Sequence, residues 1–192
     1  MRPRKSPPPP LDAAKLERLA LRYVERYATT RGRLTDYLSR KLRERGWDSD
    51  GAPAVEPLVE RFAELGYVDD RAWGEARAAA MARRGLGTRR VRQALGAAGV
   101  RGEDAEAIEA ESADAALASA VAFARRKRIG AFAAVPPADR AAVERQVAQL
   151  VRAGHDLALA RRIVRTTADD LAPMSRSDEL LDDETRLIRS LS

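Results

Sequence analysis

The sequence predicts an all-helical fold. Its composition is 45% hydrophobic and 33% charged, with Ala, Leu, Glu and Arg prominent, and these residue types lose little side-chain freedom in a helix. Apolar residues recur at helical spacing in nine segments, whereas the β-branched runs typical of strands are nearly absent. Glycines stand at the ends of several of these segments, as expected of helix C-termini.

Three helices are expected before residue 68. Asp12 is placed to cap the first, and Arg31 with Gly32 is expected to end it. The second is expected to stop at Gly46 and the third at Gly66, because glycine readily adopts the left-handed conformation that closes a helix.

The next three helices are expected around Gly85-Leu86-Gly87, a segment that interrupts the helical pattern. They are a helix from Asp69 or Asp70 to Arg84, a short helix over 88–98 that ends at Gly99, and another that opens at Asp104.

The last three helices are separated by the loop 130–137. The seventh follows Asp114, the eighth ends at Gly154, and Asp156 is expected to cap the ninth. Residues 1–10 are basic and proline-rich and predict an extended tail, whereas 172–192 are acidic and predict a mobile tail or one short helix over 179–189.

A repeat is indicated by the spacing of Gly46, Gly99 and Gly154, which are 53 and 55 residues apart, each four residues after a leucine. The spacing predicts three tandem three-helix repeats over 11–68, 69–112 and 113–171. Because one short repeat makes a poor core alone, we expect neighbours to pack into an elongated array, curved according to the angle between repeats.

Composition excludes several functions. The sequence has no cysteine, which rules out disulfides, thiolate catalysis and cysteine-based zinc sites. Its one histidine, His155, follows a helix stop, where a surface position or a helix C-terminal position near the negative end of the dipole is expected. We therefore predict no catalytic residue, metal or cofactor. No apolar run approaches membrane-spanning length and the N-terminus lacks the apolar core of a signal peptide, so a cytoplasmic protein is expected.

Two further motifs have a structural interpretation that we favour. The pairs Asp69-Asp70 and Asp169-Asp170 are acidic enough to suggest hydrated magnesium, but no third carboxylate supports either pair, and Asp69-Asp70 stands where a helix N-terminus needs an acceptor. The segment 85–87 is similar to part of a phosphate loop, but it lacks the preceding strand and the remaining motif residues, so a tight turn is favoured.

Arginine clusters are the better functional candidates, because the net charge of +6 permits binding to nucleic acid or to an acidic surface. Arg89 and Arg90 lie in the first turn of their helix, where the dipole disfavours cations, so an anionic partner is indicated. The dipole favours cations at a helix C-terminus, where the second cluster lies. The candidate anion anchors are Arg84, Arg89, Arg90 and Arg92 in the first cluster, and Arg125, Arg126, Lys127 and Arg128 in the second.

Aromatic side chains are a further candidate for stacking on single-stranded bases. Most of them fall on apolar helix stripes, so core packing is favoured, and Trp47 in a polar loop is the exception. Those considered are Tyr23, Tyr27, Tyr37, Trp47, Phe62, Tyr67 and Trp73.

The segment Gly66-Tyr67-Val68-Asp69-Asp70, the helix after it, and Gly87-Thr88-Arg89-Arg90-Val91 through Leu95 to Gly99-Val100 resemble the RecX family of recombinase regulators. The resemblance covers roughly residues 12–168. It is specific in the middle repeat and looser in the third, where His155 replaces the usual aromatic.

The resemblance implies a cytoplasmic, monomeric, non-enzymatic protein that acts in recombination, repair and the SOS response. Its partner would be the RecA filament on single-stranded DNA, with DNA bound directly or through the filament. The expected effect is inhibition of the ATPase, strand-exchange and coprotease activities. The alternative is a free-standing helix-turn-helix protein reading duplex DNA, for which the 88–98 helix offers Gln93 but no asparagine.

Overall fold

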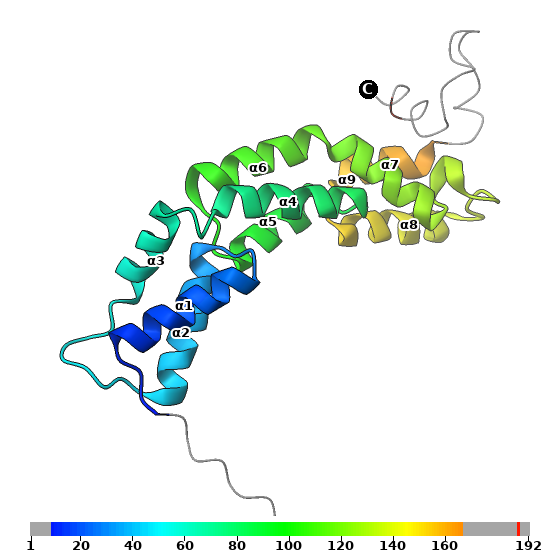
Figure 1. Cartoon of the computed structure of the whole chain (residues 1–192). Helices are drawn as coiled ribbons and strands as arrows, with labels where there is room; N and C mark the ends of the chain where they lie inside the picture. Colours follow the sequence, from blue (N-terminus) through cyan, green and yellow to red (C-terminus); the bar gives the residue numbers. More distant parts are fainter. Residues whose placement is uncertain (1–8, 167–187, 189–192) are drawn as a thin grey trace, which may run out of the picture. The chain divides into compact units, whose positions relative to one another are not determined.

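Helices account for nearly all regular structure in the computed structural model, which describes residues 9–166 and Ile188 (Figure 1). Within these residues the one β-type pairing is an isolated bridge between Leu11 and Trp47. The predicted all-helical fold is therefore confirmed. The α-helices are α1 (Ala13–Arg26), α2 (Arg31–Arg45), α3 (Val55–Glu64), α4 (Asp70–Arg83), α5 (Thr88–Ala97), α6 (Gly102–Asp114), α7 (Ala116–Lys127), α8 (Arg140–Ala153) and α9 (Leu157–Arg165), with a 3₁₀ turn η1 (Gly130–Phe132).

The chain divides into two compact units, each made from two separate stretches of sequence. Unit 1 runs to Gly74 and takes in Gly96–Asp104, whereas unit 2 comprises Glu75–Leu95 and the chain from Ala105 onward. Helices α4, α5 and α6 each begin in one unit and end in the other. The proposed division into three repeats stays a prediction.

Unit 1 is built on the helices α1, α2 and α3, with α2 packed against both neighbours (Figure 1). Asp12 caps α1 as predicted, because its side chain accepts a hydrogen bond from the Lys15 backbone N–H at 2.8 Å. Apolar residues recur every three or four positions along each helix, so each helix turns one apolar face to a shared core. That core contains Leu11, Leu16, Ala20, Leu34, Leu38, Val55, Val59, Phe62 and Val68.

The predicted boundary between the first two helices was wrong. Helix α1 already ends at Arg26, and Arg31 with Gly32 opens α2. The reason is Thr30, whose hydroxyl caps α2 by accepting from the Arg33 N–H at 3.2 Å and itself donates to the carbonyl of Ala98. The second contact joins residues 68 positions apart, so local sequence alone did not indicate it.

A close backbone approach accompanies this cap. A Cβ on Gly32 would lie 2.7 Å from the Gly99 Cα, so glycine is needed where the start of α2 meets the end of α5. Asp70 completes the junction, because its carboxylate accepts from the Arg31 backbone N–H at 2.8 Å. The N-terminus of α2 is therefore held by residues from later in the chain.

Unit 2 is built on α7, α8, α9 and η1. Asp156 caps α9 as predicted, accepting from the N–H groups of Ala158 and Leu159 at 2.7 and 3.2 Å, and Gly154 ends α8 in the left-handed conformation at φ +102°. Its core contains Ala120, Val121, Phe123, Ala124, Ile129, Val147, Leu150, Ala153, Ala160, Ile163 and Val164, with the partly buried Ile188 packed against it.

Helix α6 begins two residues earlier than predicted, at Gly102 rather than Asp104. Glu103 and Asp104 then both lie in its first turn, where acidic side chains face the positive end of the dipole. Of the two predicted tails, residues 1–8, 167–187 and 189–192 lie outside the described residues, and Ile188 is helical.

Candidate binding surface

The turn at 85–87 is a site of close contact within unit 2. Gly85 has φ +65°, and a Cβ there would lie 2.6 Å from the backbone nitrogen of Phe123 in α7. At Gly87 a Cβ would lie 2.5 Å from the carbonyl carbon of Gly154. Only glycine allows both approaches, so the two glycines have the structural role that the sequence indicated.

The first turn of α5 docks on the last turn of α8. The backbone N–H groups of Gly87 and Arg89 donate to the carbonyls of Ala153 and Gly154, at 3.0 and 3.2 Å. The terminal carbonyls of a helix lack partners within the helix. Each of these bonds therefore gives a partner both to a backbone carbonyl at the C-terminus of α8 and to a backbone N–H group at the N-terminus of α5.

The side chains of Arg89 and Arg90 extend this junction. Arg89 Nη2 donates to the Val151 carbonyl at 2.6 Å, and Arg90 Nε donates to the Arg152 carbonyl at 3.0 Å. The negative end of the α8 dipole thus offsets the cost of placing cations at the start of α5. Both side chains remain exposed, but their position no longer requires an external anion.

Arg92 faces solvent on the next turn of α5. Its Nε contacts Glu109 Oε2 on α6 at 2.6 Å, while the Arg92 side chain stays 66% exposed. Arg89 and Arg92 also line a surface pocket of about 560 Å³, whose wall includes Leu157, an exposed apolar residue. Asp156 lines it as well, so the pocket presents two guanidinium groups and one carboxylate beside an apolar surface.

The two predicted clusters meet at one point. Arg126 on α7 donates a hydrogen bond to the backbone carbonyl of Arg84, and its guanidinium lies 5.6 Å from the Phe123 ring centroid. Arg128 ends α7 in the left-handed conformation at φ +54°. All four residues of the second cluster, 125–128, are exposed. The structure thus brings Arg84 next to the second cluster, whereas Arg89 and Arg90 contact α8.

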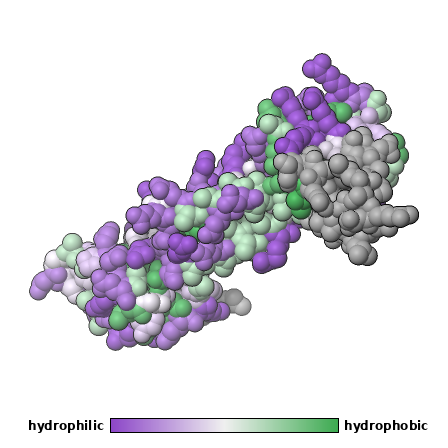
Figure 2. Space-filling view, turned by 90° about the horizontal axis from the view of Figure 1, so that it is seen from above, coloured by the Kyte–Doolittle hydropathy of each residue, from purple (hydrophilic) through white to green (hydrophobic). Residues whose placement is uncertain are grey.

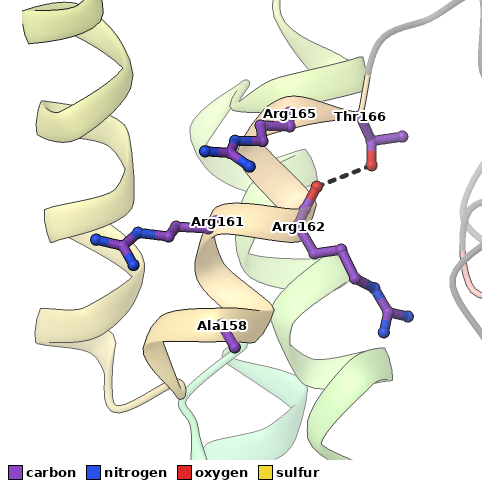
Figure 3. A pocket seen from close by; sticks show the side chains of 5 residues that line it. All are labelled: Ala158, Arg161, Arg162, Arg165 and Thr166. Atoms are coloured by element: carbon purple, nitrogen blue, oxygen red, sulfur yellow. Dashed lines mark hydrogen bonds between the residues drawn. The ribbon is translucent and has the colours of Figure 1, made fainter.

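Three further arginines on α9 were not predicted. Arg161, Arg162 and Arg165 line a pocket of about 460 Å³ with Ala158 and Thr166 (Figure 3). Figure 3 shows Arg161 and Arg165 extending to the same side of α9 and Arg162 to the other. The spacing of four between Arg161 and Arg165 is the sequence signal that would have found them.

His155 is buried, so the expected surface position was wrong. It is 4% exposed, its Nε2 lies 3.0 Å from the Gly85 carbonyl, and Phe123 packs against the edge of its ring. Since a carbonyl only accepts, Nε2 carries the proton, and the buried Nδ1 has no hydrogen-bond partner among the residues that the structure describes. Burial lowers the pKa of His155 despite the Gly85 hydrogen bond.

Asp69 and Asp70 are helix caps. Asp69 accepts from the Ala72 N–H at 2.8 Å, which caps α4, and the largely buried Asp70 holds the start of α2. Among the described residues no group of three or more histidines, cysteines or carboxylates could hold a metal ion. The pair Asp169-Asp170 lies outside them.

Trp47 does not form an open stacking platform. It packs against the core of unit 1, and its indole N–H donates to the Gly51 carbonyl at 2.9 Å.

Within the described residues, no helix has the length and apolarity needed to cross a membrane. Hydrophilic side chains cover much of the face drawn in Figure 2, with smaller hydrophobic areas among them.

These features define a helical protein with an arginine-rich surface. No protein-family model matches the chain. Regulatory protein RecX of Myxococcus xanthus (strain DK1622) is 32% identical over 173 residues, which span 85% of this chain and 88% of the relative. Regulatory protein RecX of Thermobifida fusca (strain YX) is 32% identical over 159 residues, or 79% and 78% of the two chains. The chain therefore belongs to the RecX family of regulatory proteins.

Solved structures share the fold. The crystal structure of RecX from Lactobacillus salivarius matches with a TM-score of 0.61 at 17% identity, covering 80% of this chain and 94% of that one. A second crystal structure of regulatory protein RecX gives a TM-score of 0.59 at 20% identity, covering 79% and 70%. At these identities the likeness supports the helical fold and carries no residue assignment.

Proposed function

We propose that this protein is a cytoplasmic, non-enzymatic regulator that binds the RecA filament on single-stranded DNA. It would restrain the ATPase, strand-exchange and coprotease activities of the filament. Membership of the RecX family is the observation that carries this proposal. The exposed arginines of unit 2 support it, because guanidinium groups bind both carboxylates and phosphates.

The contact surface is proposed to centre on Arg92 and the pocket beside it. Arg92 is two-thirds exposed and has one carboxylate contact, so it retains donors for a partner. Arg84 and the second cluster, 125–128, form another candidate region in the same unit. Arg89 and Arg90 are proposed to act chiefly by holding α5 on α8, with their outer donors available to the partner.

The geometry gives less support to a free-standing helix-turn-helix protein. A recognition helix of that class presents its N-terminal residues to base edges. In this chain the first turn of α5 is docked on the C-terminus of α8, and Gln93 accepts a hydrogen bond from Arg90. The residues that would read bases are thus engaged within the protein.

The proposal is tested by measuring RecA ATPase on single-stranded DNA with increasing amounts of this protein. The wild type should lower the rate. The Arg92→Ala variant should lower the ATPase rate less than the wild type does. The Glu109→Gln variant removes the same ion pair but keeps the arginine, so it should inhibit the ATPase as well as the wild type does. An absence of inhibition by the wild type would contradict the function. Equal loss in both variants would contradict only the role of Arg92.

A further inference from the structure

A third arginine-containing pocket lies on unit 1. Its volume is about 550 Å³, and it is lined by one face of α1 and one face of α2. The residues fall at helical spacing on each helix, so a single face of each contributes. They are Leu19, Arg22, Tyr23, Arg26 and Tyr27 from α1 and its C-cap, and Tyr37 and Arg40 from α2.

Three tyrosine rings form a connected group in this pocket. Tyr23 stacks on Tyr37 with centroids 4.3 Å apart and planes 19° apart, and it contacts Tyr27 at 5.3 Å with a tilt of 52°. Tyr23 and Tyr37 also pack against the core of unit 1, whereas Tyr27 is 48% exposed. The first two rings therefore position the third, which presents aromatic surface to solvent.

Cations surround these rings, and none of the described residues that line the pocket carries a carboxylate. The Arg26 guanidinium lies 5.5 Å from the Tyr27 centroid, and that of Arg40 lies 5.7 Å from the Tyr37 centroid. Arg40 has a long ion pair with Glu44, at 3.8 Å. Arg22 and Arg26 have no ion pair with any residue in the described ranges 9–166 and 188. Positive charge here is thus incompletely neutralised.

Exposed aromatic surface beside unneutralised guanidinium groups matches the chemistry of a nucleotide. Bases stack on aromatic side chains, and phosphates pair with arginine. Bases inside a duplex are unavailable for such stacking, so the matching polymer is single-stranded. The acidic side chains of a peptide would pair with the arginines but have no ring to stack on the tyrosine surface.

We infer that the Tyr27 pocket on α1 and α2 binds single-stranded nucleic acid directly, with a base stacked on Tyr27 and the phosphate backbone held by Arg22, Arg26 and Arg40. The use of this site on a RecA filament rests on the proposed function. Binding of free single strands by the full chain does not, so the two can be tested separately.

The experiment is a titration of labelled oligo(dT) with the full-length protein, followed by fluorescence anisotropy at low salt. Loss of one base–aromatic stack weakens binding about 5- to 150-fold, so Tyr27→Ala should raise Kd by at least about fivefold, and Tyr27→Phe should bind nearly as well as wild type. Tyr67→Ala is the matched control, because Tyr67 is equally exposed in the same unit at 52% but does not line the pocket.

An abasic oligonucleotide of equal length separates base from phosphate recognition. It should bind the wild type more weakly than oligo(dT) and should be insensitive to Tyr27→Ala. Equal Kd values for wild type and folded Tyr27→Ala, or equal losses in Tyr27→Ala and Tyr67→Ala, would overturn the inference. Displacement of oligo(dT) by poly-glutamate at matched charge as readily as by unlabelled DNA would also overturn it, in favour of an acidic protein partner.

The same variants distinguish failure of this site from failure of the proposed function. If the wild type does not affect RecA ATPase but binds oligo(dT) through Tyr27, the pocket stands and the regulatory function falls. If the wild type inhibits RecA but Tyr27→Ala leaves oligo(dT) binding unchanged, the regulator stands and the pocket is rejected.

Discussion

Arg89 and Arg90 illustrate how a single side chain acquires its role from a distant partner. Their position at the start of α5 predicted an external anion, because cations are disfavoured there. The carbonyls they contact, those of Val151 and Arg152, lie 62 residues further along the chain. The dipole of α5 does disfavour cations at this position, but the negative group that compensates is the end of another helix in the same protein.

Gly87 is a residue at which added volume should be costly. A Cβ there would lie 2.5 Å from the Gly154 backbone, so Gly87→Ala must move the start of α5 off α8. We expect a loss of about 2 kcal/mol or more in the free energy of unfolding. Gly96→Ala is the control, since nothing lies within 4 Å of its Cβ position.

In Gly96→Ala the better helix propensity of alanine should stabilise the protein by about 0.5–1 kcal/mol. Urea denaturation of both variants measures the two effects. A Gly87→Ala variant as stable as wild type would show that the approach of α5 to α8 is looser than described.

His155 should make stability depend on pH. Burial lowers the pKa of His155 in the folded state below its ordinary value. At a pH between the folded-state pKa and the unfolded-state pKa, the unfolded chain therefore binds more protons than the folded chain. Stability is then complete above about pH 6.5 and falls on acidification, by at most about 1.4 kcal/mol per pH unit. Thermal melts of the wild type should therefore shift downward between pH 7.5 and pH 5.5.

His155→Gln should reduce this shift, because it is the only histidine of the chain and most carboxylates titrate at lower pH. Glutamine retains a donor for the Gly85 carbonyl. An unchanged pH dependence in this variant would assign the effect to other groups.

At the scale of the element, helix α7 ends unfavourably. Arg128 closes it at φ +54°, a conformation that costs an L-residue roughly 1–2 kcal/mol. Arg128→Gly should relieve that cost and, after the greater freedom of glycine in the unfolded chain is subtracted, stabilise the protein by about 0.5–1 kcal/mol. Arg128→Ala removes the same charge and keeps the strain, so its melting temperature should not rise.

The helix ends that sequence predicted are those with a local cause. Asp12, Asp156, Gly46 and Gly154 act through bonds within their own turn or through their own backbone preference. The start of α2 was missed because Thr30 depends also on Ala98. The burial of His155 was missed for the same reason, since Gly85 and Phe123 meet it only in the folded chain.

The candidate surfaces were also predicted only as far as local sequence determines them. Arginine clusters can be found from composition and spacing, but which of them face solvent and which hold helices together depends on tertiary contacts. Arg161 and Arg165 were overlooked because single arginines at helical spacing are common in such a basic chain. The tyrosines of unit 1 were assigned to the core, and only the fold separates the half-exposed Tyr27 from the packed Tyr23 and Tyr37.

At the scale of the whole molecule, unit 1 depends on residues beyond the first predicted repeat. The start of α2 is held by Asp70 and by the carbonyl of Ala98. A fragment of residues 1–68 lacks both and should be much less stable than one of residues 1–104, which contains every part of unit 1. Circular dichroism melts of the two fragments measure this difference, and equal melting temperatures would show that the first repeat is self-sufficient.

The three helices shared between the units have a consequence for the gene. Each unit is encoded by two stretches of sequence with part of the other between them. A single crossover within the gene therefore cannot transfer one unit without part of the other, and a terminal deletion that removes all of one unit also removes part of the other. Natural variation in this chain should consequently accumulate as substitutions, insertions in the loops and changes at the ends, with the two units inherited together.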